Sequence, residues 1–179
     1  MNLDKYQELA FRTCKDTGSK KLDILHMVVG LHSELDELIP ALSNNDVVNI
    51  GEEYGDHYWY MSGLCTLYGL SFAEHINIAN MPFNPTDDDY MLVTRTSKLA
   101  NTIKRNVIYE SAKDNTSAVS IAIIEVLKTL NLGVADSNLN LLDVLTNNIN
   151  KLAVRFADKY TDYNAVNRDL ESEREMLEG

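Results

Sequence analysis

The chain has 179 residues, 45% of them hydrophobic, which is enough for one domain with a sizeable core. With only eight glycines and three prolines, the composition favours long helices over a turn-rich β protein. The formal net charge of −11 argues against a nucleic-acid polymer as partner, because a phosphate backbone is bound by basic surfaces.

Hydrophobic periodicity predicts four helices in the first 81 residues. Apolar side chains recur there at spacings of three and four, which is typical of helices with one buried face. Asp46 is a suitable N-cap and Gly69 a suitable stop for the third helix, and Ser71 with Glu74 forms a capping box for the fourth. Pro40 is expected to bend or end the last turn of the second helix. The four helices are expected over residues 3–17, 21–42, 46–68 and 71–81.

A proline-containing segment, residues 82–86, is predicted to be the linker to a second helical unit over residues 87–157. Within that unit, the helix around residues 117–130 is apolar nearly all round, so we expect it to be buried in the domain or at a subunit interface. The tail, residues 158–179, is highly charged, and residues 167–178 are expected to form a solvent-exposed helix. The regular helices of the unit are expected over residues 86–109, 117–130 and 138–155.

These elements predict a single all-α domain over residues 1–179. We expect an antiparallel bundle of five to six helices, packed around a helical hairpin formed by residues 21–70. Segments 21–81 and 87–152 share a faint internal similarity, which is consistent with two related helical units.

Two pairs of acidic residues mark the predicted hairpin. Glu34 and Glu37 lie on its first helix, and Glu53 and Asp56 lie on its second. Residues three apart share one face of a helix, so each pair forms a carboxylate patch. Such pairs also arise by chance, but these two border apolar stripes, where an unbalanced carboxylate is costly.

The charge of these carboxylates must be balanced from outside their own part of the chain. Residues 22–94 contain no Lys or Arg. A divalent metal is one source of positive charge, because Mg²⁺ takes oxygen ligands. The basic residues of segments 95–105 and 151–159 are the other two sources.

The acidic stretch also resembles a known family. GLHSELDEL followed by EEYGDHYWYMSGLCTLYGLS is similar to the MazG-like all-α nucleoside triphosphate pyrophosphatases of bacterial and phage type, which are related in fold to the dimeric dUTPases. Their signature is E-x-x-E and then E-x-x-D on two neighbouring helices. NINKLAVRFADKYTDYNAVNRDLESEREML looks like the segment that closes many members. Residues 82–137 depart from the simple members, which join the two matched parts directly.

The resemblance implies an enzyme that hydrolyses a (deoxy)nucleoside triphosphate to the monophosphate and pyrophosphate with Mg²⁺, or alternatively Mn²⁺. Glu37 and Glu53 are the candidates for taking a proton from the attacking water. The expected metal ligands are Glu34, Glu37, Glu53 and Asp56. The basic side chains expected to bind the phosphates are Lys98, Lys151, Arg155 and Lys159.

Four residues beside the acids have both a structural and a functional interpretation. Glu52 lies on a different helix face from Glu53 and is expected to be solvated. His57 is interpreted as a hydrogen-bonded core imidazole more readily than as a contact of metal-bound water. Trp59 and Tyr60 would either stack on a nucleobase or pack in the core.

Two alternatives stay open at this point. One is an enzyme like phosphoribosyl-ATP pyrophosphatase, and the other is a non-catalytic helical protein that binds metal or forms oligomers. The family and the apolar segment 117–130 both indicate a homodimer or a homotetramer.

Two cysteines are too few for a disulfide framework, and no segment approaches the length of a membrane span. We therefore expect a cytoplasmic protein without membrane contact.

Overall fold

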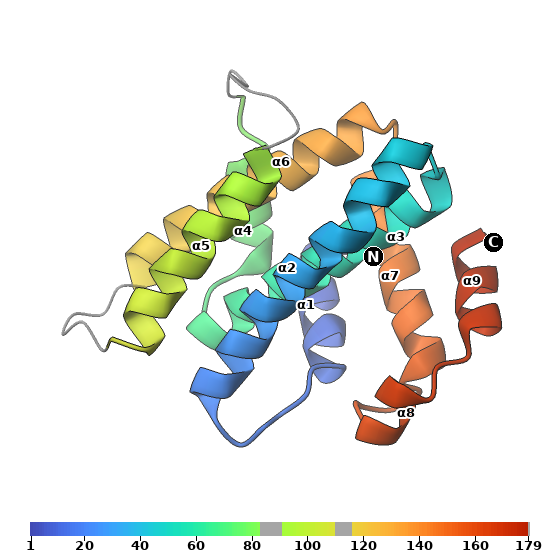
Figure 1. The fold of residues 1–179 in the computed structure, drawn as a ribbon, viewed down its shortest axis with the longest axis horizontal. Helices are drawn as coiled ribbons and strands as arrows, with labels where there is room; N and C mark the ends of the chain where they lie inside the picture. The colour runs from blue at the N-terminus through green and yellow to red at the C-terminus, as the bar shows by residue number, and fades with distance from the viewer. Residues whose placement is uncertain (83–90, 110–115, 179) are drawn as a thin grey trace.

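The computed structural model describes residues 1–82, 91–109 and 116–178, and the regular secondary structure in these ranges is entirely helical (Figure 1). In chain order the helices are α1 (Leu3–Arg12), α2 (Lys20–Asn44), α3 (Val47–Tyr68), α4 (Phe72–Ala79), α5 (Met91–Val107), α6 (Thr116–Asp136), α7 (Leu141–Arg155), α8 (Asp162–Val166) and α9 (Leu170–Glu178). The prediction of an all-α fold is confirmed. These ranges hold nine helices instead of the five to six of the expected bundle, and the short helix α8 was not expected.

Local capping chemistry explains where the central helices begin and end. At the start of α3, the side chain of Asp46 accepts a hydrogen bond from the backbone N–H of Asn49. Gly69 ends α3 in the left-handed conformation, with a φ of 69°. At the start of α4, the hydroxyl of Ser71 accepts a hydrogen bond from the N–H of Glu74. The predicted caps of these two helices are therefore present.

Other boundaries differ from the prediction or cannot be compared with it. Pro40 lies inside α2, which continues to Asn44 and ends at Asn45, a residue in the left-handed conformation with a φ of 53°. The proline therefore does not end the helix. The linker 82–86, apart from its first residue, lies outside the described residues, and so does the helix start expected at Thr86.

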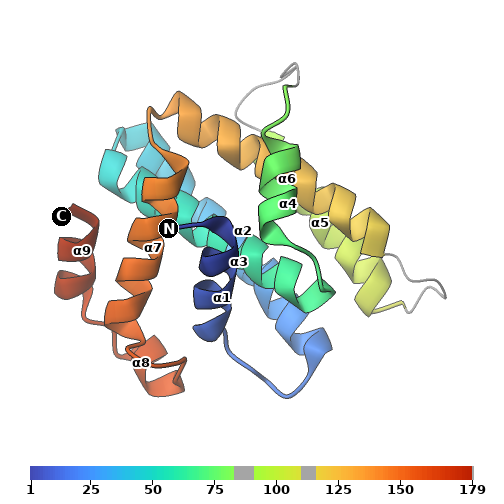
Figure 2. The ribbon, with the colours of Figure 1, turned by 180° about the vertical axis from the view of Figure 1, so that it is seen from behind.

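The hairpin of α2 and α3 lies in the middle of the molecule. Helices α4, α5 and α6 lie on one side of it and α7, α8 and α9 on the other (Figure 1, Figure 2). Helix α3 packs against α1, α6 and α7 as well as α2. Its side chains Tyr58, Met61 and Leu64 are completely buried. Acidic residues on α3 are therefore held in position by packing from several sides.

Helix α6 is, within the described ranges, the one helix that is long and apolar enough to cross a membrane by length and composition alone. It packs against α3, α4 and α5, and Ile123, Val126 and Leu130 are buried. Ile121 on the same helix is exposed. The predicted burial of this helix thus applies to one face, which is the arrangement of a core helix.

The expected helix in the charged tail is present as α9 and is largely exposed, but its face around Glu173 is buried. Helix α9 packs against α7 and α3, and Glu173 on α9 is only 2% exposed. Arg155 and Arg168 both bind the Glu173 carboxylate. This double pairing offsets the cost of burying the charge.

Candidate functional site

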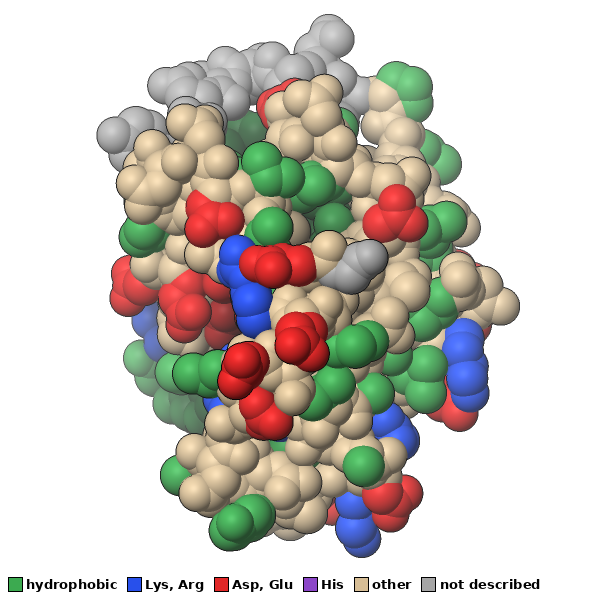
Figure 3. Space-filling view, turned by 90° about the vertical axis from the view of Figure 1, so that its right-hand side faces the viewer, with side chains coloured by type: hydrophobic (Ala, Val, Ile, Leu, Met, Phe, Trp, Pro, Cys, Tyr) green, Lys and Arg blue, Asp and Glu red, His purple; other side chains and the backbone are tan. Residues whose placement is uncertain are grey.

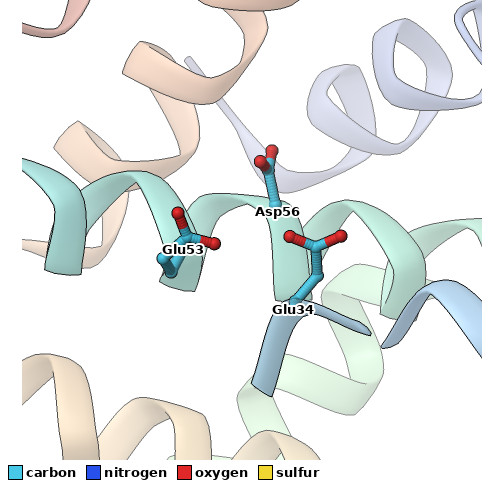
Figure 4. Close-up of side chains that lie close together, drawn as sticks. All are labelled: Glu34, Glu53 and Asp56. Atoms are coloured by element: carbon cyan, nitrogen blue, oxygen red, sulfur yellow. The ribbon is translucent and has the colours of Figure 1, made fainter. Parts of the chain in front are cut away.

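Three carboxylates converge between α2 and α3. Glu34 extends from α2, and Glu53 and Asp56 extend from α3, where their spacing of three residues puts them on one face. One oxygen atom from each of the three lies within 4.8 Å of those of the other two. Figure 4 shows the three side chains close together, one from α2 and two from α3. Carboxylates arranged in this way can bind a divalent cation.

Two of these acids, Glu34 and Glu53, have raised pKa values. Burial, and then the charges of Asp56 and Glu37, raise the pKa of Glu53 to about 9. Burial and the same two neighbours raise the pKa of Glu34 to about 7. The Oε2 atom of Glu53 is buried and has no hydrogen-bond partner among the residues that the structure describes. A divalent cation fits this donor set, because it would satisfy the orphaned oxygen and stabilise the charged carboxylates.

Glu37, the fourth expected ligand, lies at the edge of the cluster. Its charge contributes to the raised pKa of both Glu34 and Glu53. Its side chain is exposed, and it is not one of the three residues whose oxygen atoms converge. Of the four residues predicted as ligands, three are therefore brought together, with Glu37 beside them.

Asp56 is held by polar side chains from α7. The Nδ2 atom of Asn148 donates a hydrogen bond to Oδ1 of Asp56 at 2.7 Å, and Nζ of Lys151 donates to Oδ2 at 2.6 Å. The hydroxyl of Tyr6 donates to Oδ1 of Asn148 at 3.1 Å and so fixes the orientation of the amide. Each oxygen of Asp56 thus has a hydrogen-bond partner. Side chains that bind metal ions are commonly oriented by supporting hydrogen bonds of this kind.

Lys151 lies against carboxylates. Its side chain is fully buried, and Nζ also lies 3.2 Å from Oε1 of Glu52. Burial lowers the pKa of Lys151, but the charges of Asp56 and Glu52 outweigh burial, so the net shift is upward and the lysine stays charged. Glu52 was expected to be solvated, and this is wrong, because the buried ammonium group draws it inward.

A pocket of about 280 Å³ opens beside the carboxylate cluster. One part of its lining is acidic, one part is basic and one part is aromatic. The acidic residues are Glu34, Glu37, Glu52 and Asp56, the basic ones are Arg155 and Arg168, and the aromatic ones are Trp59, Tyr60, Phe156 and Tyr160. Such a lining suits a ligand with both a flat apolar group and negative charges that a metal and guanidinium groups can share.

The other basic residues that were expected to bind phosphate lie elsewhere. Arg155 lines the pocket, but Lys98 is exposed on α5 and Lys159 is exposed after the end of α7. Neither lysine belongs to the described lining of the pocket. The face that carries α9 is also rich in acidic side chains over its middle (Figure 3). Positive charge at the pocket therefore comes from a small number of side chains.

Arg168 and Glu173 were not predicted as residues of the site. The guanidinium of Arg155 donates from Nε and Nη2 to the two oxygens of Glu173, at 2.9 and 2.6 Å. Nη2 of Arg168 donates to Oε2 of the same carboxylate at 2.7 Å. One signal in the sequence was usable: Glu173 lies between Leu170 and Leu177 at helical spacing, so it interrupts an apolar face.

His57, Trp59 and Tyr60, which each had two interpretations from the sequence, lie in or beside the site. His57 is buried, its Nδ1 lies 2.7 Å from the carbonyl oxygen of Glu53, and burial lowers its pKa to about 4. It is therefore a neutral core imidazole, as interpreted from the sequence. Trp59 lines the pocket, and its Nε1 donates to the carbonyl oxygen of Ala10 and to Thr13, which fixes the indole. Tyr60 packs edge-on against that ring and lines the same pocket.

No protein-family model, curated protein or solved structure matches the chain. The chemistry of the site therefore indicates the class of the protein. The features that define it are three converging carboxylates, Glu34, Glu53 and Asp56, and a pocket that two of them, Glu34 and Asp56, share with two arginines. They define a helical protein with a candidate divalent-metal site next to a candidate anion site.

Proposed function

We propose that the protein is a Mg²⁺-dependent nucleoside triphosphate pyrophosphohydrolase that converts a (deoxy)nucleoside triphosphate to the monophosphate and pyrophosphate, in control of the nucleotide pool. The observation that carries the proposal is the lining of one pocket by carboxylates and by guanidinium groups. A bare anion would be repelled by the carboxylates, and a bare cation would be repelled by the arginines. A polyphosphate with a bound divalent cation is complementary to both.

In this proposal Glu34, Glu53 and Asp56 hold the metal, with Glu37 as a further ligand at the edge of the cluster. Mg²⁺, or Mn²⁺ in its place, supplies a Lewis acid that lowers the pKa of a bound water. Glu37 and Glu53 remain the candidates for taking the proton of that water. Glu37 is exposed enough to exchange protons with solvent, and Glu53 has an oxygen atom with no partner among the described residues.

The remaining parts of the pocket would bind the substrate. Arg155 and Arg168 are suited to the phosphates, because a guanidinium group can bind two phosphate oxygens at once. Trp59 and Tyr60 are suited to a nucleobase, because an indole fixed by hydrogen bonds offers its face at little cost in entropy. Lys151 would act indirectly, through its bond to Asp56. We also propose a homodimer or homotetramer as the assembly.

The experiment that tests this function is a panel of nucleoside and deoxynucleoside triphosphates incubated with the protein and Mg²⁺, with release of pyrophosphate as the measurement. We expect turnover of at least one nucleotide, and its loss when EDTA removes the metal. The same panel reports the preferred base and sugar. If micromolar protein turns over none of the nucleotides, the enzyme is not a pyrophosphohydrolase, and a non-catalytic metal-binding protein becomes the better description.

A further inference from the structure

Glu173 joins the two arginines of the pocket to each other. Arg155 and Arg168 are 13 residues apart in the sequence, and both bind the Glu173 carboxylate. All their recorded bonds to Glu173 use the Nε and Nη2 atoms of each arginine. The Nη1 atom of each remains without a hydrogen bond to any residue that the structure describes. The two guanidinium groups are thus fixed along one edge while each keeps donors for a ligand.

Glu173 keeps its negative charge although it is buried. Its side chain is almost completely buried, and the hydrogen bonds from Arg155 and Arg168 overcome the effect of burial and lower its pKa to about 2. It therefore stays ionised at any physiological pH. Helix α9 is also tied to the central hairpin, because Nη1 of Arg174 donates to Oδ1 of Asn49 at 2.5 Å. The carboxylate is presented by a helix that is itself anchored.

Without Glu173, other acids in the pocket would compete for the arginines. Glu34, Glu52 and Asp56 line the same pocket as Arg155 and Arg168, and two guanidinium groups that share no anion repel each other. Released arginines would therefore be drawn to the carboxylates that hold the metal. Such an ion pair would remove a phosphate-binding group and occupy a metal ligand at the same time. An acid on α9 that binds both arginines prevents this.

We propose that Glu173 is a positioning residue, which holds Arg155 and Arg168 apart from the metal-binding carboxylates so that both can bind the phosphates of a polyphosphate ligand. The proposal rests on the proposed function in taking a polyphosphate as the occupant of the pocket. It assigns to α9 a part in ligand binding, although no residue of α9 lines the described pocket. The arginines carry the effect to the ligand.

The test measures binding of inorganic pyrophosphate, in the presence of Mg²⁺, by isothermal titration calorimetry on the full chain. Glu173→Gln keeps the size of the side chain and removes its charge, and we expect the dissociation constant to rise about tenfold, because charge-assisted hydrogen bonds would no longer orient the arginines. Glu173→Asp keeps the charge, and we expect a smaller rise of the dissociation constant in this variant. The matched control is Glu178→Gln, which removes an exposed acid from the same helix and should leave the dissociation constant unchanged.

A second measurement separates positioning from simple support of the fold. In the background of Arg155→Gln and Arg168→Gln, adding Glu173→Gln should cause no further loss of pyrophosphate binding, because the residue acts only through those arginines. A further loss of the same size in that background would overturn the proposal. Unchanged or tighter binding in the single Glu173→Gln variant would also overturn it, and would make Glu173 a competing anion.

Failure of this proposal is distinguishable from failure of the proposed function. If nucleotides are turned over but Glu173→Gln binds pyrophosphate like the wild type, the function stands and the role of Glu173 is wrong. If no nucleotide is turned over but pyrophosphate binding weakens in the expected pattern, the role of Glu173 stands and the hydrolase is wrong. Where turnover is measured, Glu173→Gln should raise KM about tenfold and change kcat little, which is the pattern of lost uniform binding.

Discussion

The ammonium group of Lys151 lies 2.6 Å from Oδ2 of Asp56, and the lysine has no exposed surface. The two residues are 95 positions apart in sequence and join α7 to α3. A second acid, Glu52, lies 3.2 Å from the same ammonium group. This buried cluster supports the fold and at the same time orients a candidate metal ligand. Its removal should therefore affect both stability and ligand binding.

We expect Lys151→Met to lower the free energy of unfolding by about 3 kcal/mol, because removing one partner of a buried ion pair leaves the other charge uncompensated. Urea denaturation measures the change. Lys5→Met is the matched control, since Lys5 forms an exposed pair with Glu8 and surface pairs contribute little. If Lys151→Met lowered the free energy of unfolding by less than about 1 kcal/mol, the prediction would be wrong. Water would then solvate Asp56 and Glu52 in place of the lysine.

Asn148→Ala tests the other bond to Asp56. The amide donates to Oδ1 of Asp56 and is itself fixed by Tyr6. Loss of such a supporting bond typically costs 10–100-fold in metal affinity or activity, and we expect an effect of about that size on kcat/KM at subsaturating Mg²⁺. Asn150→Ala, a half-buried neighbour on the same helix, is the control. Equal activity of the two variants would argue that Lys151 alone orients Asp56.

Glu53→Gln should abolish turnover while helix content is retained. The carboxylate is buried and one of its oxygens lacks a partner in the described structure, so a neutral amide is tolerated there but is a poor metal ligand. Pyrophosphate release and circular dichroism measure the two effects. Glu175→Gln removes an exposed acid from α9 and should leave both unchanged. Wild-type activity in Glu53→Gln would exclude the carboxylate cluster as the metal site.

The metal-free protein should lose stability as the pH rises. Folding raises the pKa of Glu34 from 4.5 to about 7 and that of Glu53 from 4.5 to about 9. The folded state therefore binds more protons than the unfolded state above pH 4.5, and the stability from these groups is lost as pH rises through their folded pKa values. In EDTA we expect Tm to fall between about pH 5 and pH 9.

Added Mg²⁺ should reverse that loss at alkaline pH. A ligand at 100 times its Kd stabilises the folded state by about 2.7 kcal/mol, which raises Tm of a protein of this size by roughly 5–10 °C. The shift should be larger at pH 8 than at pH 5, because metal competes with protons for the same carboxylates. A shift that does not change with pH would place the metal elsewhere.

Local features of the sequence predicted most of the helices and the centre of the site. Asp46, Gly69 and Ser71 act on backbone groups within a few residues, so their effect on helix ends follows from spacing alone. Glu53 and Asp56 share a face for the same reason. These predictions needed no knowledge of how the helices pack.

The partners of those acids depend on packing, and the sequence named segment 151–159 only as one of three sources of balancing charge. Lys151 was expected to bind phosphate, but α7 packs on α3 and brings it to Glu52 and Asp56. Periodicity shows that a side chain is on a given helix face and does not show which charge lies opposite. The burial of Glu173 was missed for the same reason, because it depends on Arg155 of α7 and on Arg168.

The distance in sequence between Asp56 and Lys151 also has a consequence for synthesis. The ribosome adds roughly 5–20 residues per second, so the 95 positions between them correspond to a delay of roughly 5–20 s. During that time the nascent hairpin of α2 and α3 carries its acids without the lysine that neutralises them. Protons, dissolved cations and the basic residues made earlier, such as those of segment 95–105, are present at that stage. The ion pair that joins α7 to α3 can therefore form only late in synthesis, after the hairpin of α2 and α3 has been made.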